Sequence, residues 1–171
     1  MNGKMQKLSQ LSGYLRGLVL FATAVVIGYL GYQLGVNGEL RLGSTPLTEA
    51  LWHDERASHT VLLMMVLPQF ITMLLGVFWL QRLLGYYQQG LFFTAESMRC
   101  YLWLIWLKVA DFGLDIVRHL AVGNYHSQFF TSTEIELPID FGNLTTLLLM
   151  LVIVYLLKAA KEIEAENKEF I

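Results

Sequence analysis

The chain has 171 residues, of which 55% are hydrophobic and only 15% are charged, and its formal net charge is −2. A soluble domain carries about 25% charged residues, so this composition argues against a disordered tail protein and an ordinary cytosolic enzyme. The absence of a basic excess argues against direct binding of nucleic acid. The single cysteine, Cys100, excludes an intramolecular disulfide and a multi-thiolate metal site. These exclusions leave an integral membrane protein.

Four segments are long enough to cross a bilayer, whose hydrocarbon core of about 30 Å takes ~20 helical residues. The first, at about 11–33, is predicted to be an uncleaved anchor, because too few apolar residues precede the Ala22-Thr23-Ala24 triplet for a signal peptide. The other three lie at about 60–84, 98–122 and 141–160. Backbone groups inside a bilayer must be satisfied locally. The sequence therefore predicts one all-α membrane domain over residues 1–171, a four-transmembrane-helix bundle.

The distribution of lysine and arginine predicts the orientation of the spans. Eight basic residues flank the spans on one side: Lys4, Lys7, Arg16, Arg82, Arg99, Lys158, Lys161 and Lys168. The loops on the other side carry only Arg41 and Arg56. By the positive-inside rule both termini, the loop 85–97 and the tail 161–171 are cytoplasmic, and the loops 34–59 and 123–140 are periplasmic.

Capping and turn residues suggest further local structure. Thr45-Pro46 precedes a short interfacial helix predicted at 47–53, and Thr94 with Ser97 offers an N-cap for the third span. Asp140 or Asn143 is expected to cap the fourth span, after an extended segment at 131–138.

Short motifs around the spans resemble a family of small bacterial inner-membrane proteins with four predicted spans, catalogued as a domain of unknown function. The motif residues are Tyr87, Gly90, Phe93 and Thr94 in the loop, with Glu166 and Asn167 near the end of the chain. The resemblance implies a multi-pass protein of the bacterial inner membrane. It also implies, by association, a Cro/CI-type helix-turn-helix regulator encoded nearby as a partner. The six motif residues are therefore the candidates for partner binding.

The third span departs from that family pattern because it contains four charges: Lys108, Asp111, Asp115 and Arg118. Their spacings of 3, 4 and 3 residues place them within about an 80° sector of one helix face. Each charge at mid-bilayer costs about 2.5–3.5 kcal/mol, so we expect Lys108 to pair with Asp111 and Asp115 with Arg118. Such a ladder can be a buried structural network or an ion or proton site.

All four histidines lie toward the outer side: His53, His59, His119 and His126. With the acidic residues of the outer loops they are weak candidates for a metal site. Their spacing matches no standard ligand motif, so we expect no metal and no cofactor.

Small residues form a stripe on the first span, at Gly17, Ala24, Gly28, Gly31 and Gly35. Such a stripe allows close helix approach in lipid. It fits packing within the bundle or, alternatively, a homo-oligomer seam.

Taken together, these features predict a non-enzymatic regulatory or adaptor protein that binds a cytoplasmic or membrane partner. No nucleophile, phosphate-loop or zinc-protease motif supports an enzyme. A small ion- or proton-coupled transporter or channel subunit is the first alternative, based on the charged third span. A metal or haem redox protein is the second, based on the outer histidines alone.

Overall fold

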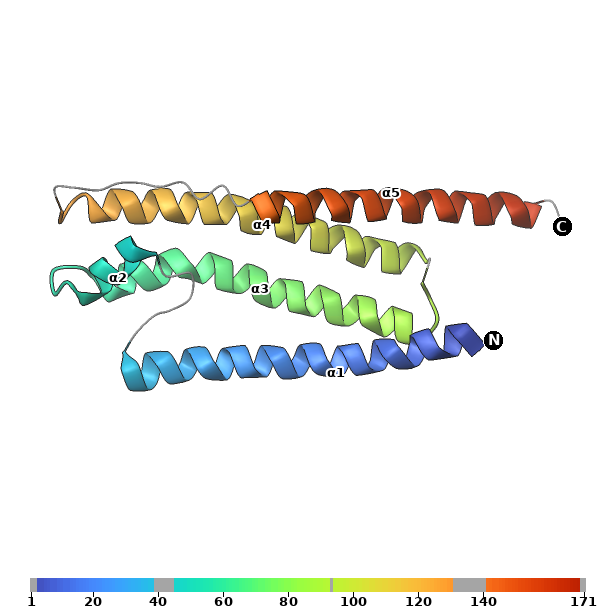
Figure 1. Cartoon of the computed structure of the whole chain (residues 1–171), viewed down its shortest axis with the longest axis horizontal. Helices are drawn as coiled ribbons and strands as arrows, with labels where there is room; N and C mark the ends of the chain where they lie inside the picture. Colours follow the sequence, from blue (N-terminus) through green and yellow to red (C-terminus); the bar gives the residue numbers. More distant parts are fainter. Residues whose placement is uncertain (1–2, 39–44, 93, 131–140, 170–171) are drawn as a thin grey trace. The chain divides into compact units, whose positions relative to one another are not determined.

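The computed structural model describes residues 3–38, 45–92, 94–130 and 141–169. The helical elements in this part of the chain are α1 (Gly3–Tyr32), a π-helical turn η1 (Gln33–Asn37), α2 (Pro46–His53), α3 (His59–Gln88), α4 (Ala95–His126) and α5 (Phe141–Glu169) (Figure 1). Helices make up 88% of the described residues, which contain no strand. The predicted all-α class is confirmed for these residues.

Three helices are long and apolar enough to cross a membrane. The apolar stretches are Ser9–Val36 in α1 and η1, all of α3, and Phe141–Ala159 in α5. α4 has 32 residues, but its charged residues lower its hydropathy. Three helices therefore have the length and composition of membrane spans. Whether α4 can also cross a membrane depends on how its charges are neutralised.

The end of α3 is a Schellman motif, which sets the α3–α4 turn. The amide of Gly90 donates to the carbonyl of Tyr87 at 3.0 Å, and the amide of Leu91 donates to the carbonyl of Tyr86 at 3.0 Å. This pattern requires a left-handed residue after the helix, and Gly90 supplies it with φ 78°. The helix consequently continues to Gln88, beyond the predicted span end at Leu84.

The start of α4 confirms the predicted cap. Thr94 Oγ1 accepts a hydrogen bond from the amide of Ser97 at 3.3 Å, and Ser97 Oγ donates to the Phe92 carbonyl at 3.0 Å. An N-cap hydroxyl satisfies one of the amides left over at a helix start. Glu96 in the first turn has the charge that this end of a helix favours.

The predicted short helix and the predicted cap of the fourth span have different outcomes. α2 begins at Pro46 after Thr45, whose hydroxyl accepts from the amide of Thr48, so the predicted short helix is confirmed. α5 begins at Phe141, so Asn143 lies inside the helix and is not its N-cap. The alternative cap Asp140, the segment 131–138 and Phe93 lie outside the described residues.

The chain forms two compact units, each described by itself. The first comprises Met1–Leu20, Leu75–Val109 and Asp140–Ile171. In this unit the hydroxyl of Ser9 on α1 donates to the carbonyl of Gln88 on α3. A methyl group added at Gly13 would come within 3.3 Å of Gln88 Nε2, so glycine allows the two helices to approach closely here.

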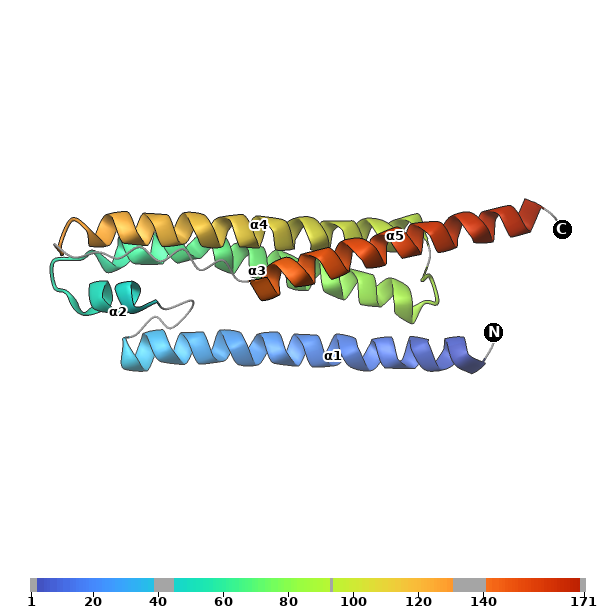
Figure 2. The same cartoon turned by 45° about the horizontal axis from the view of Figure 1, so that its top comes forward.

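The second unit comprises Phe21–Leu74 and Ala110–Ile139. Its core lies where α2, the start of α3 and the end of α4 meet. The buried residues of this core are Leu51, Ala57, Leu62 and Val122. The hydroxyl of Tyr125 on α4 accepts from the amide of Ser58 at 2.9 Å. Both views show α2 beside the start of α3 (Figure 1 and Figure 2), as expected for a short helix that buries Thr48 and Leu51.

Candidate functional site

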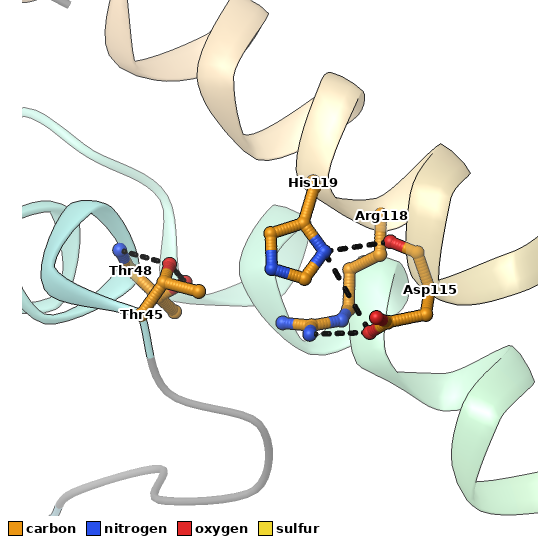
Figure 3. Close-up of polar contacts among 5 residues, drawn as sticks. All are labelled: Thr45, Thr48, Asp115, Arg118 and His119. Atoms are coloured by element: carbon orange, nitrogen blue, oxygen red, sulfur yellow. Dashed lines mark hydrogen bonds and ion pairs between the residues drawn. The ribbon is translucent and has the colours of Figure 1, made fainter. Parts of the chain in front are cut away.

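Three polar residues of α4 form a cluster in the second unit, which we call the α4 polar cluster: Asp115, Arg118 and His119. Arg118 Nη2 lies 2.8 Å from Asp115 Oδ1, which is the ion pair expected from their spacing. His119 Nδ1 lies 3.6 Å from the same carboxylate oxygen. Figure 3 shows these three side chains converging, and it shows separately the contact between Thr45 and Thr48 at the start of α2.

The hydrogen bond of His119 defines its tautomer. His119 Nδ1 is 2.8 Å from the backbone carbonyl of Asp115. A carbonyl oxygen can only accept, so Nδ1 must carry the proton, and in the neutral ring Nε2 has none. Nε2 is therefore the ring atom that can take up a proton, while Nδ1 keeps the ring in place.

Burial determines what the cluster can do. The side chain of Arg118 is 5% exposed and that of Asp115 is 27% exposed. Removing one member of a buried ion pair costs about 3–5 kcal/mol, because the remaining charge is left uncompensated. With neutral His119 the cluster carries no net charge, and protonation of Nε2 would give it a charge of one. It can thus act as a structural pair or as a proton-binding site.

The other two residues of the predicted ladder are Lys108 and Asp111. Lys108 belongs to the first compact unit and Asp111 to the second. Both are partly buried, and both take part in interactions of their own. Their mutual pairing stays a prediction.

The four histidines do not converge. His53 Nδ1 is 2.9 Å from the carbonyl of Glu49, and His59 Nε2 is 3.0 Å from the carbonyl of Trp52. The His126 ring stacks on Phe130 with a centroid distance of 4.3 Å. In the described part of the chain, no three His, Cys, Asp or Glu side chains are grouped closely enough to hold a metal ion.

The loop residues named as partner candidates have local structural roles. Gly90 provides the left-handed residue of the α3 end, and Thr94 caps α4. The ring of Tyr87 contacts that of Phe92, with centroids 5.2 Å apart. Glu166 and Asn167 lie within α5, and their side chains, like the residue Phe93, lie outside what the structure describes. Partner binding by these residues stays a prediction.

The small-residue stripe on α1 and η1 does not contact other helices through its glycines. A methyl group added at Gly17, Gly28, Gly31 or Gly35 would meet nothing within 4 Å. Ala24 is also exposed. Within this chain the close approach that glycine permits is therefore not used at these positions, and the seam between two copies stays a prediction.

A groove in the first unit, here named the α3–α4 groove, has a volume of about 840 Å³. Its principal lining residues are Trp79, Arg82, Tyr86, Glu96, Arg99 and Trp103. The sequence offers one signal, because Trp79, Arg82 and Tyr86 share a helix face at spacings of 3 and 4 residues. The pairing of that face with α4 is a tertiary feature that no motif indicates.

The comparison with protein families gives a match. The family described as "Protein of unknown function (DUF2975)" matches residues 19–171. The chain belongs to this family. No curated protein and no solved structure matches the chain. The DUF2975 match includes the α4 polar cluster, the α3–α4 groove and α5, so each of these features lies within the family region.

Proposed function

We propose that the chain is a four-span protein of the bacterial inner membrane with both termini in the cytoplasm. α4 has 32 residues, which is about 48 Å of helix and more than a bilayer core requires. The ion pair between Asp115 and Arg118 supports its insertion, because paired charges avoid much of the cost of isolated ones in lipid. The excess of basic residues at one end of the spans supports the orientation.

Reporter fusions test this topology. After Ile171, a reporter that works only in the cytoplasm should be active and one that works only in the periplasm should be inactive. Within residues 123–140, the periplasmic reporter should be active and the cytoplasmic reporter inactive. The reversed result, with residues 123–140 in the cytoplasm and the end after Ile171 in the periplasm, would contradict a fourth span, since three crossings from a cytoplasmic N-terminus place the two sites in that way.

We further propose that the protein is a non-enzymatic regulatory or adaptor protein that binds its partner at the cytoplasmic ends of the helices. The observation that carries this proposal is the length of α5. Its apolar part ends at Ala159, yet the helix continues to Glu169. The extension is rich in lysine and glutamate and adds about 15 Å of helix beyond the apolar part. A projecting charged helix is a surface for protein binding. A helix-turn-helix regulator is the partner that the family resemblance implies.

Localisation of a fluorescent Cro/CI-type regulator that is co-expressed with this protein tests the proposal. Deletion of residues 162–171 should release the regulator from the membrane while the protein stays inserted. As a matched control, an unrelated charged helix of equal length replaces the same residues and should also release it. A regulator that stays at the membrane in both variants and in a replacement of residues 87–94 contradicts the adaptor function.

Ion- or proton-coupled transport is the second candidate, and the α4 polar cluster is the observation that favours it. A buried Asp–Arg pair beside a histidine with a proton-accepting Nε2 has the groups that a proton relay uses. Purified protein in liposomes with a pH-sensitive dye inside should then show proton flux, and His119→Gln should abolish it. Absence of flux from the unmodified protein contradicts this candidate.

A further inference from the structure

We propose that the α3–α4 groove is a binding site for the headgroup of an anionic phospholipid. This inference goes beyond the adaptor function and requires only that α3 crosses the bilayer. The groove is built entirely within the first compact unit, from the last turns of α3 and the first turns of α4.

The floor of the groove is aromatic. The rings of Trp79 and Trp103 stack with centroids 5.4 Å apart and an interplanar angle of 8°. Trp103 is 47% exposed, so part of this surface is open. Cys100, which is 2% exposed, also lines the groove. Flat aromatic surfaces of this kind accommodate the glycerol and upper acyl region of a lipid, and tryptophan is enriched at that depth.

Two contacts fix the position of Arg82 on the same surface. The guanidinium carbon of Arg82 lies 5.5 Å from the centroid of Trp79, in a cation–π contact. Arg82 Nη2 is 3.5 Å from the hydroxyl of Tyr86. These contacts hold the guanidinium beside the tryptophan floor and leave it other N–H donors, since a guanidinium has five.

Charge complementarity favours an anion. Arg82 and Arg99 both line the groove, and Glu96 is the acidic residue among its lining residues. The groove therefore carries a net positive charge of one. Two guanidinium groups that line one groove suit a phosphate oxyanion, to which arginine donates in a planar fork.

The depth of the groove fits a lipid phosphate. Residues 60–81 of α3 contain no Asp, Glu, Lys or Arg, and at ~1.5 Å per residue they extend about 33 Å. That length matches the hydrocarbon core of about 30 Å. Arg82 is the next residue, so it lies at headgroup level with Trp79 just inside. Basic pockets between membrane helices at this level bind anionic headgroups.

Quenching of tryptophan fluorescence by brominated lipids tests the site. The full chain is placed in phosphatidylcholine nanodiscs that contain either brominated phosphatidylglycerol or brominated phosphatidylcholine at equal fraction. Phosphatidylglycerol should quench more strongly, and the ratio of the two apparent association constants measures headgroup selectivity. Each arginine should contribute about a fivefold factor to this ratio.

Four variants define the outcome. Arg99→Gln, which leaves the Arg82–Trp79 contact in place, should lower the ratio about fivefold, and Arg82→Gln with Arg99→Gln should bring it to one. Glu96→Gln should raise the ratio, because it removes the negative charge beside the phosphate. Lys7→Gln removes an exposed charge outside the groove and should leave the ratio unchanged.

Three results would overturn the proposal. The first is equal quenching by the two lipids in the unmodified protein. The second is an unchanged ratio in Arg99→Gln and in the double variant. The third is displacement of phosphatidylglycerol by inorganic phosphate, which would assign the groove to a soluble phosphate. None of these measurements depends on a protein partner, so failure of the adaptor proposal would leave them unaffected.

Discussion

Arg16 on α1 and Gln81 on α3 exchange two hydrogen bonds. Arg16 Nε donates to Gln81 Oε1 at 3.1 Å, and Gln81 Nε2 donates to the backbone carbonyl of Arg16 at 3.0 Å. Both residues lie in the first compact unit. This reciprocal pair is a specific polar connection between α1 and α3, in addition to the Ser9–Gln88 hydrogen bond, so it fixes their register where hydrophobic packing in lipid would not.

Replacing Gln81 by Leu should therefore loosen α1. Hydrogen bonds between membrane helices contribute about 0.6 kcal/mol on average and at most about 1.7 kcal/mol. Two bonds are lost here, so we expect a loss near the upper figure in the free energy of unfolding, measured in detergent by denaturant titration. Gln89→Leu serves as the control, because Gln89 is exposed at the end of the helix. Equal losses in the two variants would contradict the role of the pair.

Gly90→Ala should destabilise the α3–α4 turn. Gly90 has φ 78°, and a non-glycine residue in the left-handed region costs about 1–2 kcal/mol. Gly76→Ala is the matched control, since an added methyl group there meets nothing within 4 Å and alanine favours a helix. We expect a lower melting temperature for Gly90→Ala alone, and an unchanged or higher one for Gly76→Ala.

In the α4 polar cluster, removing one charge of the ion pair should lower the stability more than removing both charges. Asp115→Asn leaves the buried Arg118 without its carboxylate, which costs about 3–5 kcal/mol. Arg118→Met combined with Asp115→Asn removes both charges and should recover most of that loss in thermal unfolding. If Asp115→Asn leaves the melting temperature unchanged, the side chains already reach water, and the transport candidate becomes stronger than the adaptor proposal.

Acid should weaken the turn between α2 and α3. Hydrogen bonds from the side chain and the backbone amide of Arg56 lower the pKa of Asp54 from 3.8 to about 2. Because the folded pKa is depressed, the stabilisation is fully present above pH 3.8 and is lost as the pH falls toward 2. Carboxyl carbon shifts in NMR should report this low pKa, and Arg56→Gln should return it toward 3.8. An unchanged pKa in that variant would show that another group is responsible.

Local signals in the sequence predict several of these features. Features that depend on tertiary packing are not predicted by the sequence. Thr45-Pro46 marks the start of α2 and Thr94 with Ser97 the start of α4, because capping depends on residues a few positions apart. The pair Asp115–Arg118 follows in the same way from helical spacing.

The α3–α4 groove and the Arg16–Gln81 pair each join residues of two different helices. Their formation therefore depends on how those helices pack, which no local motif indicates. The π-helical turn η1 over Gln33–Asn37 is also unpredicted, since the sequence predicts that the first span ends at about 33 and that residues 34–59 form a loop. Its hydrogen-bonding register is set at Gly38, whose amide donates to Gln33.

Because Cys100 is buried, the natural sequence is a convenient background for site-specific labelling. It is the single cysteine of the chain and is 2% exposed. Thiol-reactive spin labels or dyes therefore have no accessible target in the folded protein. A cysteine introduced at an exposed position of α1 or α5 would carry the label alone, and distances between labelled helices could be measured with no prior removal of a native residue.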